Sequence, residues 1–159
     1  RLERIQQGPR QSPYRLFCLG VMHFQRAVIE VKWGNYWSAG VLFRKAYQQI
    51  RENQQRFPFF APNQVYAGAL EVAAGTIPEG YRWVGSLLGI GGTIRGGLGQ
   101  LENFLARSDE LSRLFHEEGL FYYAYLRFYV ANDRTGTLSY LEQQQPDRKS
   151  TRLNSSHRT

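Results

Sequence analysis

Apolar side chains recur every three or four residues in the first part of the chain, which is the spacing of one face of a helix. Between Ser12 and Trp33 they occupy positions 17, 21, 24, 28 and 31. Ser12 followed by Pro13 is typical of an N-cap with proline at the first helical position. The pattern therefore predicts a helix from Pro13 to Trp33.

A second helix is predicted after a tight turn that Gly34 and Asn35 indicate. It runs from Tyr36 to about Phe57, and the prolines that follow end it. Its other side is polar. Its apolar side is expected to hold Trp37, Val41, Ala46 and Ile50.

Capping residues, glycine and proline divide the rest of the chain into five further predicted helices. Their expected ranges are 63–75 with Asn63 as the cap, 79–88, 93–106 with Thr93 as the cap, 109–131 and 135–144. Residues 1–12 indicate a helix end and a loop. No segment alternates apolar and polar residues over the length of a strand. We therefore predict an all-α fold of about seven helices, arranged as antiparallel hairpins.

Small residues repeat at a fixed spacing across three of the predicted turns. In each copy a small residue is followed twelve positions later by another, and four positions further on by a large one. Two antiparallel helices approach closely only where neither carries a bulky side chain, and the large residue fills the space beneath. The three copies are Ala27, Ala39 and Phe43; Gly85, Gly97 and Leu101; and Ala124, Gly136 and Tyr140.

The first copy resembles the second half of a tetratricopeptide repeat, through Gly34, Tyr36, Ala39, Phe43 and Ala46. The copies start 58 and then 39 residues apart, whereas that repeat has a period of about 34. His23 stands where the motif often has tryptophan. We therefore expect an irregular array of stacked hairpins.

Longer stretches, from about Tyr14 to Gln144, resemble uncharacterised bacterial tetratricopeptide-like proteins and, more distantly, the inclusion-body-clearance and tetratricopeptide-repeat-39 group. The resemblance implies a helical-repeat fold and, in bacterial relatives, an exported or envelope-associated protein. It brings no catalytic residues and no cofactor. Its most distinctive residues are Ile77, Pro78, Tyr81, Trp83, Leu87, Leu88, Gly89, Gly92, Gly97, Leu98, Leu101 and Glu102.

The C-terminal tail changes how the charge is interpreted. The segment from Asp147 to His157 resembles a translated sequencing adapter, and it has one leucine among polar and charged residues. We expect 147–159 to be disordered, 13–146 to form the helical-repeat domain and 1–12 to be a partial segment of a longer protein. The tail holds four of the 20 basic and one of the 13 acidic residues, so the rest has a net charge of +4.

This modest charge does not indicate a nucleic-acid partner. Arg44, Lys45, Arg51 and Arg56 alternate with glutamine and glutamate, as on a solvated helix face. The single cysteine, Cys18, excludes an internal disulfide, and no apolar run has the length of a membrane-spanning helix. With 159 residues and 42% hydrophobic content, the chain suits one soluble domain.

Two segments resemble cofactor-binding or metal-binding motifs, but neither has the residue spacing that its motif requires. The glycine-rich segment 87–99 has Ile94 where a dinucleotide fingerprint needs glycine, and Leu98 where a Walker loop needs lysine. His116 and Glu117 begin a metalloprotease-like motif, but Leu120 replaces the second histidine. We therefore predict no cofactor and no metal.

His23 and Glu30 lie seven residues apart on one helix face, where they could form an acid–base pair. An enzyme or lipid-handling domain with a site near these two residues is the alternative function. The discriminating observation is whether they lie within hydrogen-bond distance of each other beside an enclosed cavity.

Aromatic residues surround most of the predicted helix 109–131, more than a one-sided core helix needs. With Ala124 as the packing residue, Phe121, Tyr125 and Phe128 are expected on the concave side of the array. Either a following repeat or a partner covers them, and of the two we favour a following repeat. The preferred function is a non-enzymatic helical-repeat scaffold that binds a protein or peptide.

Overall fold

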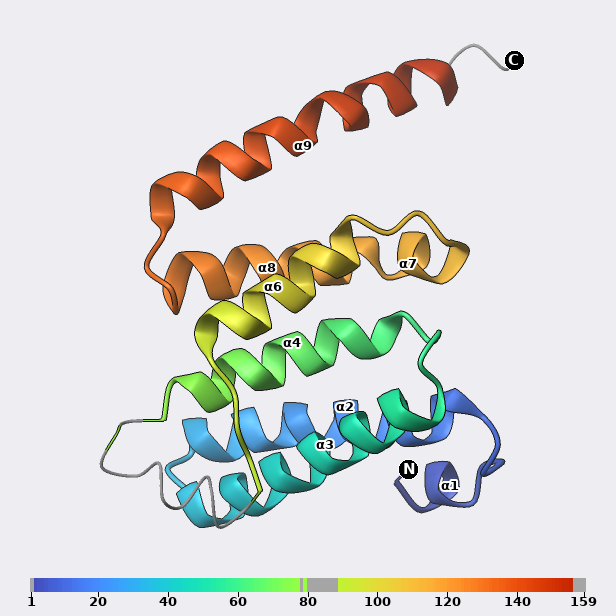
Figure 1. The fold of residues 1–159 in the computed structure, drawn as a ribbon, viewed down its shortest axis with the longest axis vertical. Coiled ribbons are helices and arrows are strands. Elements are labelled where there is room, and N and C mark those ends of the chain that lie inside the picture. The colour runs from blue at the N-terminus through green and yellow to red at the C-terminus, as the bar shows by residue number, and fades with distance from the viewer. Residues whose placement is uncertain (1, 78, 80–88, 156–159) are drawn as a thin grey trace.

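The computed structural model describes residues 2–77, 79 and 89–155, and every regular element in these residues is a helix (Figure 1). The predicted all-α class is confirmed. The described helices are α1 (Leu2–Gln6), α2 (Pro13–Lys32), α3 (Tyr36–Arg56), α4 (Pro62–Gly75), α6 (Ile94–Leu105), α7 (Glu110–Leu114), α8 (His116–Tyr129) and α9 (Arg134–Ser155).

The helices are stacked in the order of the chain. The α2–α3 hairpin lies at one end, α4 lies on it, α6 and α8 follow, and α9 lies at the other end (Figure 1). Contacts join α2 to α3, α3 to α4, α4 to α6, α6 to α8 and α8 to α9. Each helix therefore packs mainly on helices that are near it in the sequence.

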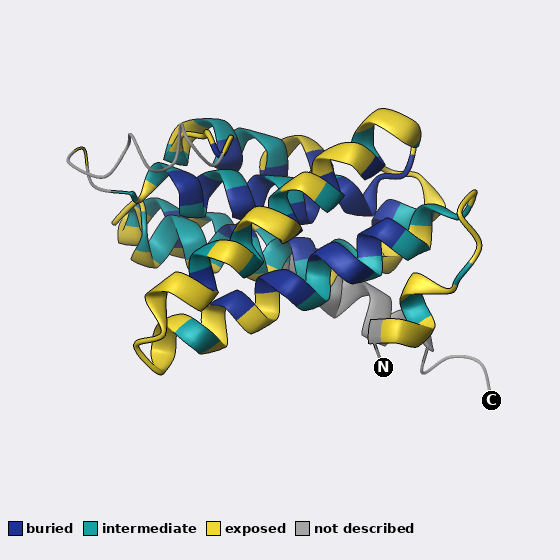
Figure 2. Cartoon of the chain, turned by 90° about the horizontal axis from the view of Figure 1, so that it is seen from below, coloured by how far each residue is buried: buried dark blue, intermediate teal, exposed yellow. Residues whose placement is uncertain are grey.

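The core lies around α4, which has buried residues on every side, from Val65 and Tyr66 to Val72. A helix that is apolar all round belongs in the interior. The rings of Phe17 on α2 and Tyr66 on α4 meet edge to face, with centroids 5.4 Å apart. Leu101 and Phe104 of α6 complete the same cluster. Figure 2 shows the buried positions of the helices facing one another and the exposed ones turned outward.

Local sequence signals place several helix ends correctly. The Ser12 hydroxyl accepts a hydrogen bond from the Tyr14 N–H (3.3 Å), with Pro13 as the first residue of α2. The Thr93 hydroxyl accepts from the Gly96 N–H (3.0 Å) at the start of α6. These side chains satisfy backbone N–H groups that have no partner within the helix.

The predicted apolar side of α3 is half wrong. Ala46 and Ile50 are buried, but Trp37 and Val41 are exposed. The stripe that faces the interior passes through Ala39. Two positions correspond to a rotation of about 200° around a helix with 3.6 residues per turn, so Trp37 points away from the side that holds Ala39.

The predicted cap of α4 is also wrong. The residue before the helix is Ala61, and Asn63 lies inside the first turn with its side chain buried. The Asn63 Oδ1 atom accepts a hydrogen bond from Asn53 Nδ2 (2.8 Å) at the end of α3. Asn63 therefore joins two helices instead of capping one.

The long helix predicted over 109–131 is divided in two at Phe115, which ends α7 and precedes α8. The Phe115 ring lies edge to face with Phe17, with centroids 5.9 Å apart, so tertiary packing accounts for the break. Asp109 caps α7 by accepting from the Ser112 N–H (3.1 Å), and the hydrogen bonds from Ser112 lower the pKa of Asp109 to about 2.

The last predicted helix ends too early, because α9 continues past Gln144 to Ser155. The end of α9 thus covers residues 147–155, which belong to the segment predicted to be disordered. The helix predicted at 79–88 lies almost wholly outside the described residues.

Candidate functional site

His23 and Glu30 do not form a pair. The His23 Nδ1 atom lies 2.8 Å from Gln49 Oε1 of α3, in a buried position. The Glu30 carboxylate accepts from Asn35 Nδ2 (2.9 Å) and lies 3.8 Å from Arg26 Nε. Each side chain has its own structural partner, so the geometry required for acid–base chemistry between them is not present.

The small residues of the first repeat copy lie where close packing requires them. Ala27 of α2 and Ala39 of α3 are both buried in the hairpin. The Phe43 ring packs against Phe24 of α2, with centroids 6.2 Å apart. The role of the two alanines as the crossing point of α2 and α3 stays a prediction.

The second repeat copy lies only in part within the described residues. Gly85 lies outside the described residues, while Gly97 and Leu101 of α6 are buried against α4. A Cβ atom on Gly97 would lie 2.5 Å from the Gly68 carbonyl oxygen of α4 and 2.6 Å from Val72. The absence of a side chain on Gly97 therefore allows α6 to cross closely over α4.

In the third copy the glycine leaves room for a charged pair. A Cβ atom on Gly136 would collide with the Asp133 carboxylate and the Arg127 guanidinium. Asp133 Oδ1 accepts a hydrogen bond from the Gly136 N–H (3.0 Å). Tyr140 packs against Tyr123 of α8, with ring centroids 5.0 Å apart. The nearest neighbours of Gly136 are thus Asp133 and Arg127, and its predicted pairing with Ala124 at a helix crossing stays a prediction.

Three exposed aromatic rings form a ladder along α8. Phe121, Tyr125 and Tyr129 are 63%, 50% and 66% exposed, and they lie four residues apart, on one helix face. The Phe121 and Tyr125 rings are stacked (6.0 Å, 23°), and the centroids of Tyr125 and Tyr129 are 4.9 Å apart. We call these three residues the aromatic ladder.

A groove of about 440 Å³ runs between the ladder and α9. Phe128 lies in its wall, half-buried, with the Arg134 guanidinium carbon 5.5 Å from its ring centroid. All three predicted contact residues, Phe121, Tyr125 and Phe128, are thus at the groove. Its lining is Glu117, Leu120, Phe121, Ala124, Tyr125, Phe128, Tyr129, Thr137, Leu138 and Leu141.

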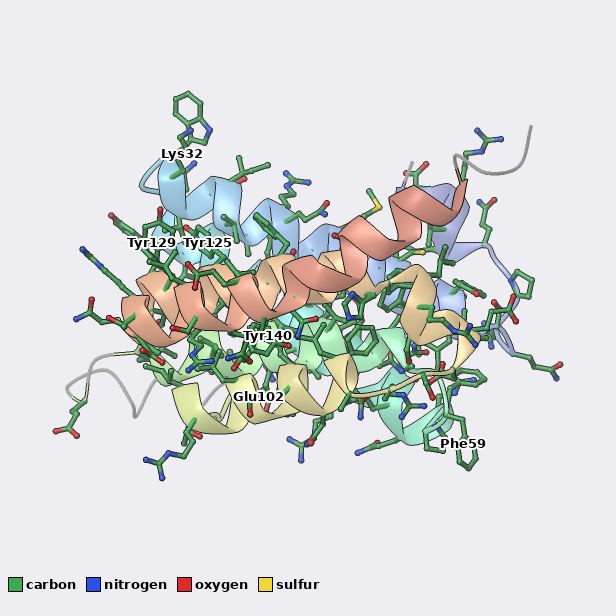
Figure 3. The ribbon with its side chains drawn as sticks, turned by 90° about the horizontal axis from the view of Figure 1, so that it is seen from above. Lys32, Phe59, Glu102, Tyr125, Tyr129 and Tyr140 are labelled. Atoms are coloured by element: carbon green, nitrogen blue, oxygen red, sulfur yellow. The ribbon has the colours of Figure 1, made fainter. Side chains whose placement is uncertain are left out.

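A polar network fixes the far side of α8. The buried Tyr123 hydroxyl donates to Glu102 Oε1 of α6 (2.5 Å) and accepts from Arg127 (2.8 Å). The Arg127 guanidinium lies 2.7 Å from Asp133 Oδ2 in the turn before α9, and this contact lowers the pKa of Asp133. Figure 3 shows Tyr125 and Tyr129 on one side of α9, with Tyr140 and Glu102 on the other. The network therefore holds the walls of the groove without lining it.

A second contact ties α8 to the central helix. The Tyr66 hydroxyl of α4 donates to Glu118, and the Tyr66 and Tyr122 rings meet with centroids 5.5 Å apart. Burial, and then the Glu118 hydrogen bond, raise the pKa of Tyr66 above its usual range. The groove is thus supported by interactions from α4 and α6.

The sequence did not indicate the second wall of the groove, which α9 forms. Leu138 and Leu141 of α9 face the ladder. Their spacing of three residues is a helical signal, but it is too short to show which neighbour the face meets. Tyr129 was also missed as a member of the ladder, although it lies four residues after Tyr125.

Other site types find no support in the described residues. Within them, no group of three histidine, cysteine, aspartate or glutamate side chains is placed to hold a metal ion. None of the described helices combines the length and the apolar character needed to span a membrane. No protein-family model, curated protein or solved structure matches the chain.

Proposed function

We propose that this chain is a tetratricopeptide-like helical-repeat module whose α8–α9 groove binds the apolar face of an amphipathic helix from a protein partner. The observation that carries the proposal is the aromatic ladder beside Leu138 and Leu141. The resemblance to tetratricopeptide repeats is supported by the α2–α3 hairpin, where Ala27 and Ala39 are buried at the expected positions.

The shape of the groove suits a short helix. Phe121 and Tyr129 are eight residues apart, which is about 12 Å at a rise of 1.5 Å per residue. A bound helix of two to three turns presents side chains at i, i+4 and i+7 over the same distance. Complete burial of one aliphatic or aromatic side chain contributes about 1.5–3 kcal/mol, so two or three anchors suffice for specific binding.

The ladder has the properties of a binding hot spot. Tyrosine and phenylalanine have few rotatable bonds, so little side-chain entropy is lost when they are covered. Ring stacking restricts Phe121 and Tyr125 further. The wall behind them is fixed by the Tyr123–Arg127–Asp133 network. A preorganised groove loses less entropy on binding than a flexible one.

The test measures binding of fluorescent amphipathic peptides with apolar residues at i, i+4 and i+7 by anisotropy, against peptides of the same composition in scrambled order. Phe121→Ser with Tyr125→Ser should weaken binding at least tenfold, because hot-spot truncations typically cost about 2 kcal/mol or more. Tyr125→Phe should retain binding, since the ring remains.

Phe59→Ser is the matched control, because Phe59 is an exposed aromatic residue (89%) outside the groove (Figure 3). It should bind the peptides as the parent protein does. Equal binding of ordered and scrambled peptides, or equal losses in the groove variant and the control, would show that the groove is not a helix-binding site. If the groove variant instead unfolds at a clearly lower temperature, the ladder is part of the core.

A further inference from the structure

A second apolar surface lies at the other end of the stack, at the tip of the α2–α3 hairpin. Trp33, Tyr36 and Trp37 are 76%, 72% and 84% exposed. All residues from 31 to 38 are exposed, and Figure 2 shows this turn standing at the edge of the molecule. The tip does not include any residue of the α8–α9 groove.

The exposed apolar residues of the tip continue along the exposed side of α2. On α2, Val28, Ile29 and Val31 are each more than half exposed. At 3.6 residues per turn these three residues lie within an arc of about 160° around the helix axis, so they form one exposed apolar side of α2 that continues from the tip.

The residue types favour the interface of a lipid layer. Tryptophan and tyrosine gather at the boundary between lipid headgroups and acyl chains, because each combines an apolar ring with a polar N–H or O–H group. Val28 lies five residues before Trp33, so the apolar tip is about 7 Å deep along α2. Interfacial segments typically enter the membrane by about 5–10 Å.

The charge of the tip favours anionic lipids. Residues 26–45 hold four basic side chains and one acidic side chain, Glu30, which lies 3.8 Å from Arg26. In the described part of the chain, Lys32, Arg44 and Lys45 form no ion pair. Lys32 lies at the outer end of α2, next to Trp33 (Figure 3). Lys45 follows Trp37 and Val41 along one face of α3, at i+8 and i+4.

We propose that the α2–α3 tip binds the surface of an anionic phospholipid membrane. Trp33, Tyr36 and Trp37, at the outermost end of the tip, lie at the boundary between the lipid headgroups and the acyl chains. Lys32 contacts lipid phosphates, and Arg44 and Lys45 remain in water above the surface, where they add attraction at long range. Membrane attachment at this end leaves the α8–α9 groove free at the other end of the stack.

The experiment is flotation of the full chain with vesicles of phosphatidylcholine and phosphatidylglycerol in equal amounts, and with vesicles of phosphatidylcholine alone. The protein should float with the anionic vesicles, and added salt should weaken the binding, because screening reduces the attraction of the basic residues. The double variant Trp33→Ser and Trp37→Ser should lower the partition coefficient more than tenfold. Lys32→Gln should lower it about fivefold.

Two controls match these variants. Phe59→Ser removes an equally exposed aromatic residue, and Arg95→Gln removes an exposed basic residue of α6. Both should float as the parent does, and circular dichroism of every variant should match that of the parent. Trp37→Ser alone serves if the double variant does not fold, since Trp37 lies on the outer side of α3.

Three results would overturn the proposal. The first is that the parent fails to float with anionic vesicles. The second is that Phe59→Ser and Arg95→Gln reduce flotation as much as the tip variants do. The third is that the tip variants change only the oligomeric state in sedimentation, which would make the tip a contact between copies of the chain. None of these results depends on peptide binding in the groove.

Discussion

Gly68 of α4 and Gly97 of α6 lie face to face where the two helices cross. A Cβ atom on Gly97 would lie 2.5 Å from the Gly68 carbonyl oxygen, and one on Gly68 would lie 2.7 Å from the Gly97 carbonyl oxygen. Each glycine thus admits the backbone of the other helix. The crossing fixes α6 on the central helix, and α8 packs on α6 in turn.

The first prediction tests this crossing. Gly97→Ala should destabilise the protein by about 1–3 kcal/mol, because the added methyl group meets backbone atoms that cannot rotate away. Gly99→Ala, two residues further along α6, is the control, since a Cβ atom there meets no atom within 4 Å. It should be neutral or stabilise by up to about 1 kcal/mol, the gain in helix propensity. Urea unfolding of both variants measures the difference, and equal shifts would show that the crossing is misplaced.

The second prediction concerns the start of α6. Thr93→Ala should lower the free energy of unfolding by about 1 kcal/mol, because the Gly96 N–H loses its hydrogen-bond acceptor. Thr93→Ser should retain the cap. Ser139→Ala, at an exposed position of α9, should have an effect within about 0.5 kcal/mol. Thermal melting followed by circular dichroism distinguishes these variants, and a neutral Thr93→Ala would contradict the role of the cap.

The third prediction concerns alkaline pH. Burial, and then the Glu102 hydrogen bond, raise the pKa of Tyr123 from 10.0 to about 12. Above pH 10 the phenol ionises more readily in the unfolded state than in the folded state. The stabilisation from the neutral Tyr123 phenol is therefore complete below pH 10 and is lost as the pH rises towards 12. The burial of Tyr66 and Tyr122 raises the pKa of each in the same direction.

The measurement is unfolding by urea at a series of pH values, together with the phenolate absorbance. The free energy of unfolding should fall steeply above pH 10. Tyr123→Phe should make this fall less steep, because it removes one phenol whose pKa is higher in the folded state than in the unfolded state. Tyr36→Phe, at the exposed hairpin tip, should leave the slope of the parent unchanged. A Tyr123→Phe profile parallel to that of the parent would show that Tyr123 is not protected.

The fourth prediction concerns the junction of three helices at Asn53. Its Nδ2 atom donates to the Pro13 carbonyl oxygen (2.9 Å) and to Asn63 Oδ1 (2.8 Å), in a fully buried position. Asn53→Ala should cost about 1–3 kcal/mol, because the buried Asn63 Oδ1 atom and the half-buried Pro13 carbonyl oxygen lose their donor. Gln55→Ala, on the exposed side of α3, is the control and should be nearly neutral.

A double-mutant cycle sharpens this test. If Asn53 and Asn63 interact as the distance indicates, the cost of Asn53→Ala should be smaller in an Asn63→Ala background than in the parent. Additive costs, measured by urea unfolding, would show that the two side chains do not interact.

Much of the secondary structure follows from local chemistry and was therefore predictable. Ser12 and Thr93 cap their helices as the sequence predicts, because a cap involves a side chain and backbone N–H groups within three residues of it. Gly34, with a φ of 77°, ends the first hairpin helix for an equally local reason. The all-α class follows from the same signals.

Part of the packing was also predictable, where one helix meets the next along the chain. Ala27 and Ala39 are buried in the α2–α3 hairpin and Phe43 packs on Phe24, because a short turn leaves the two helices of a hairpin few ways to align. The candidate contact residues Phe121, Tyr125 and Phe128 reach the surface of one groove, but their role as a binding site remains a prediction.

Contacts between residues far apart in the sequence were decided only by the tertiary structure. Gly97 meets Gly68, which lies 29 positions before it in the sequence, because α6 packs on α4. Asn63 binds Asn53 in place of capping α4, and Phe115 interrupts a continuous helical pattern to pack on Phe17. The sequence by itself determined that the described elements are helices and where several of them begin, since caps and helical hydrogen bonds join residues within four positions of each other. The tertiary structure decided which faces meet, since that choice depends on close packing and buried hydrogen bonds between distant segments.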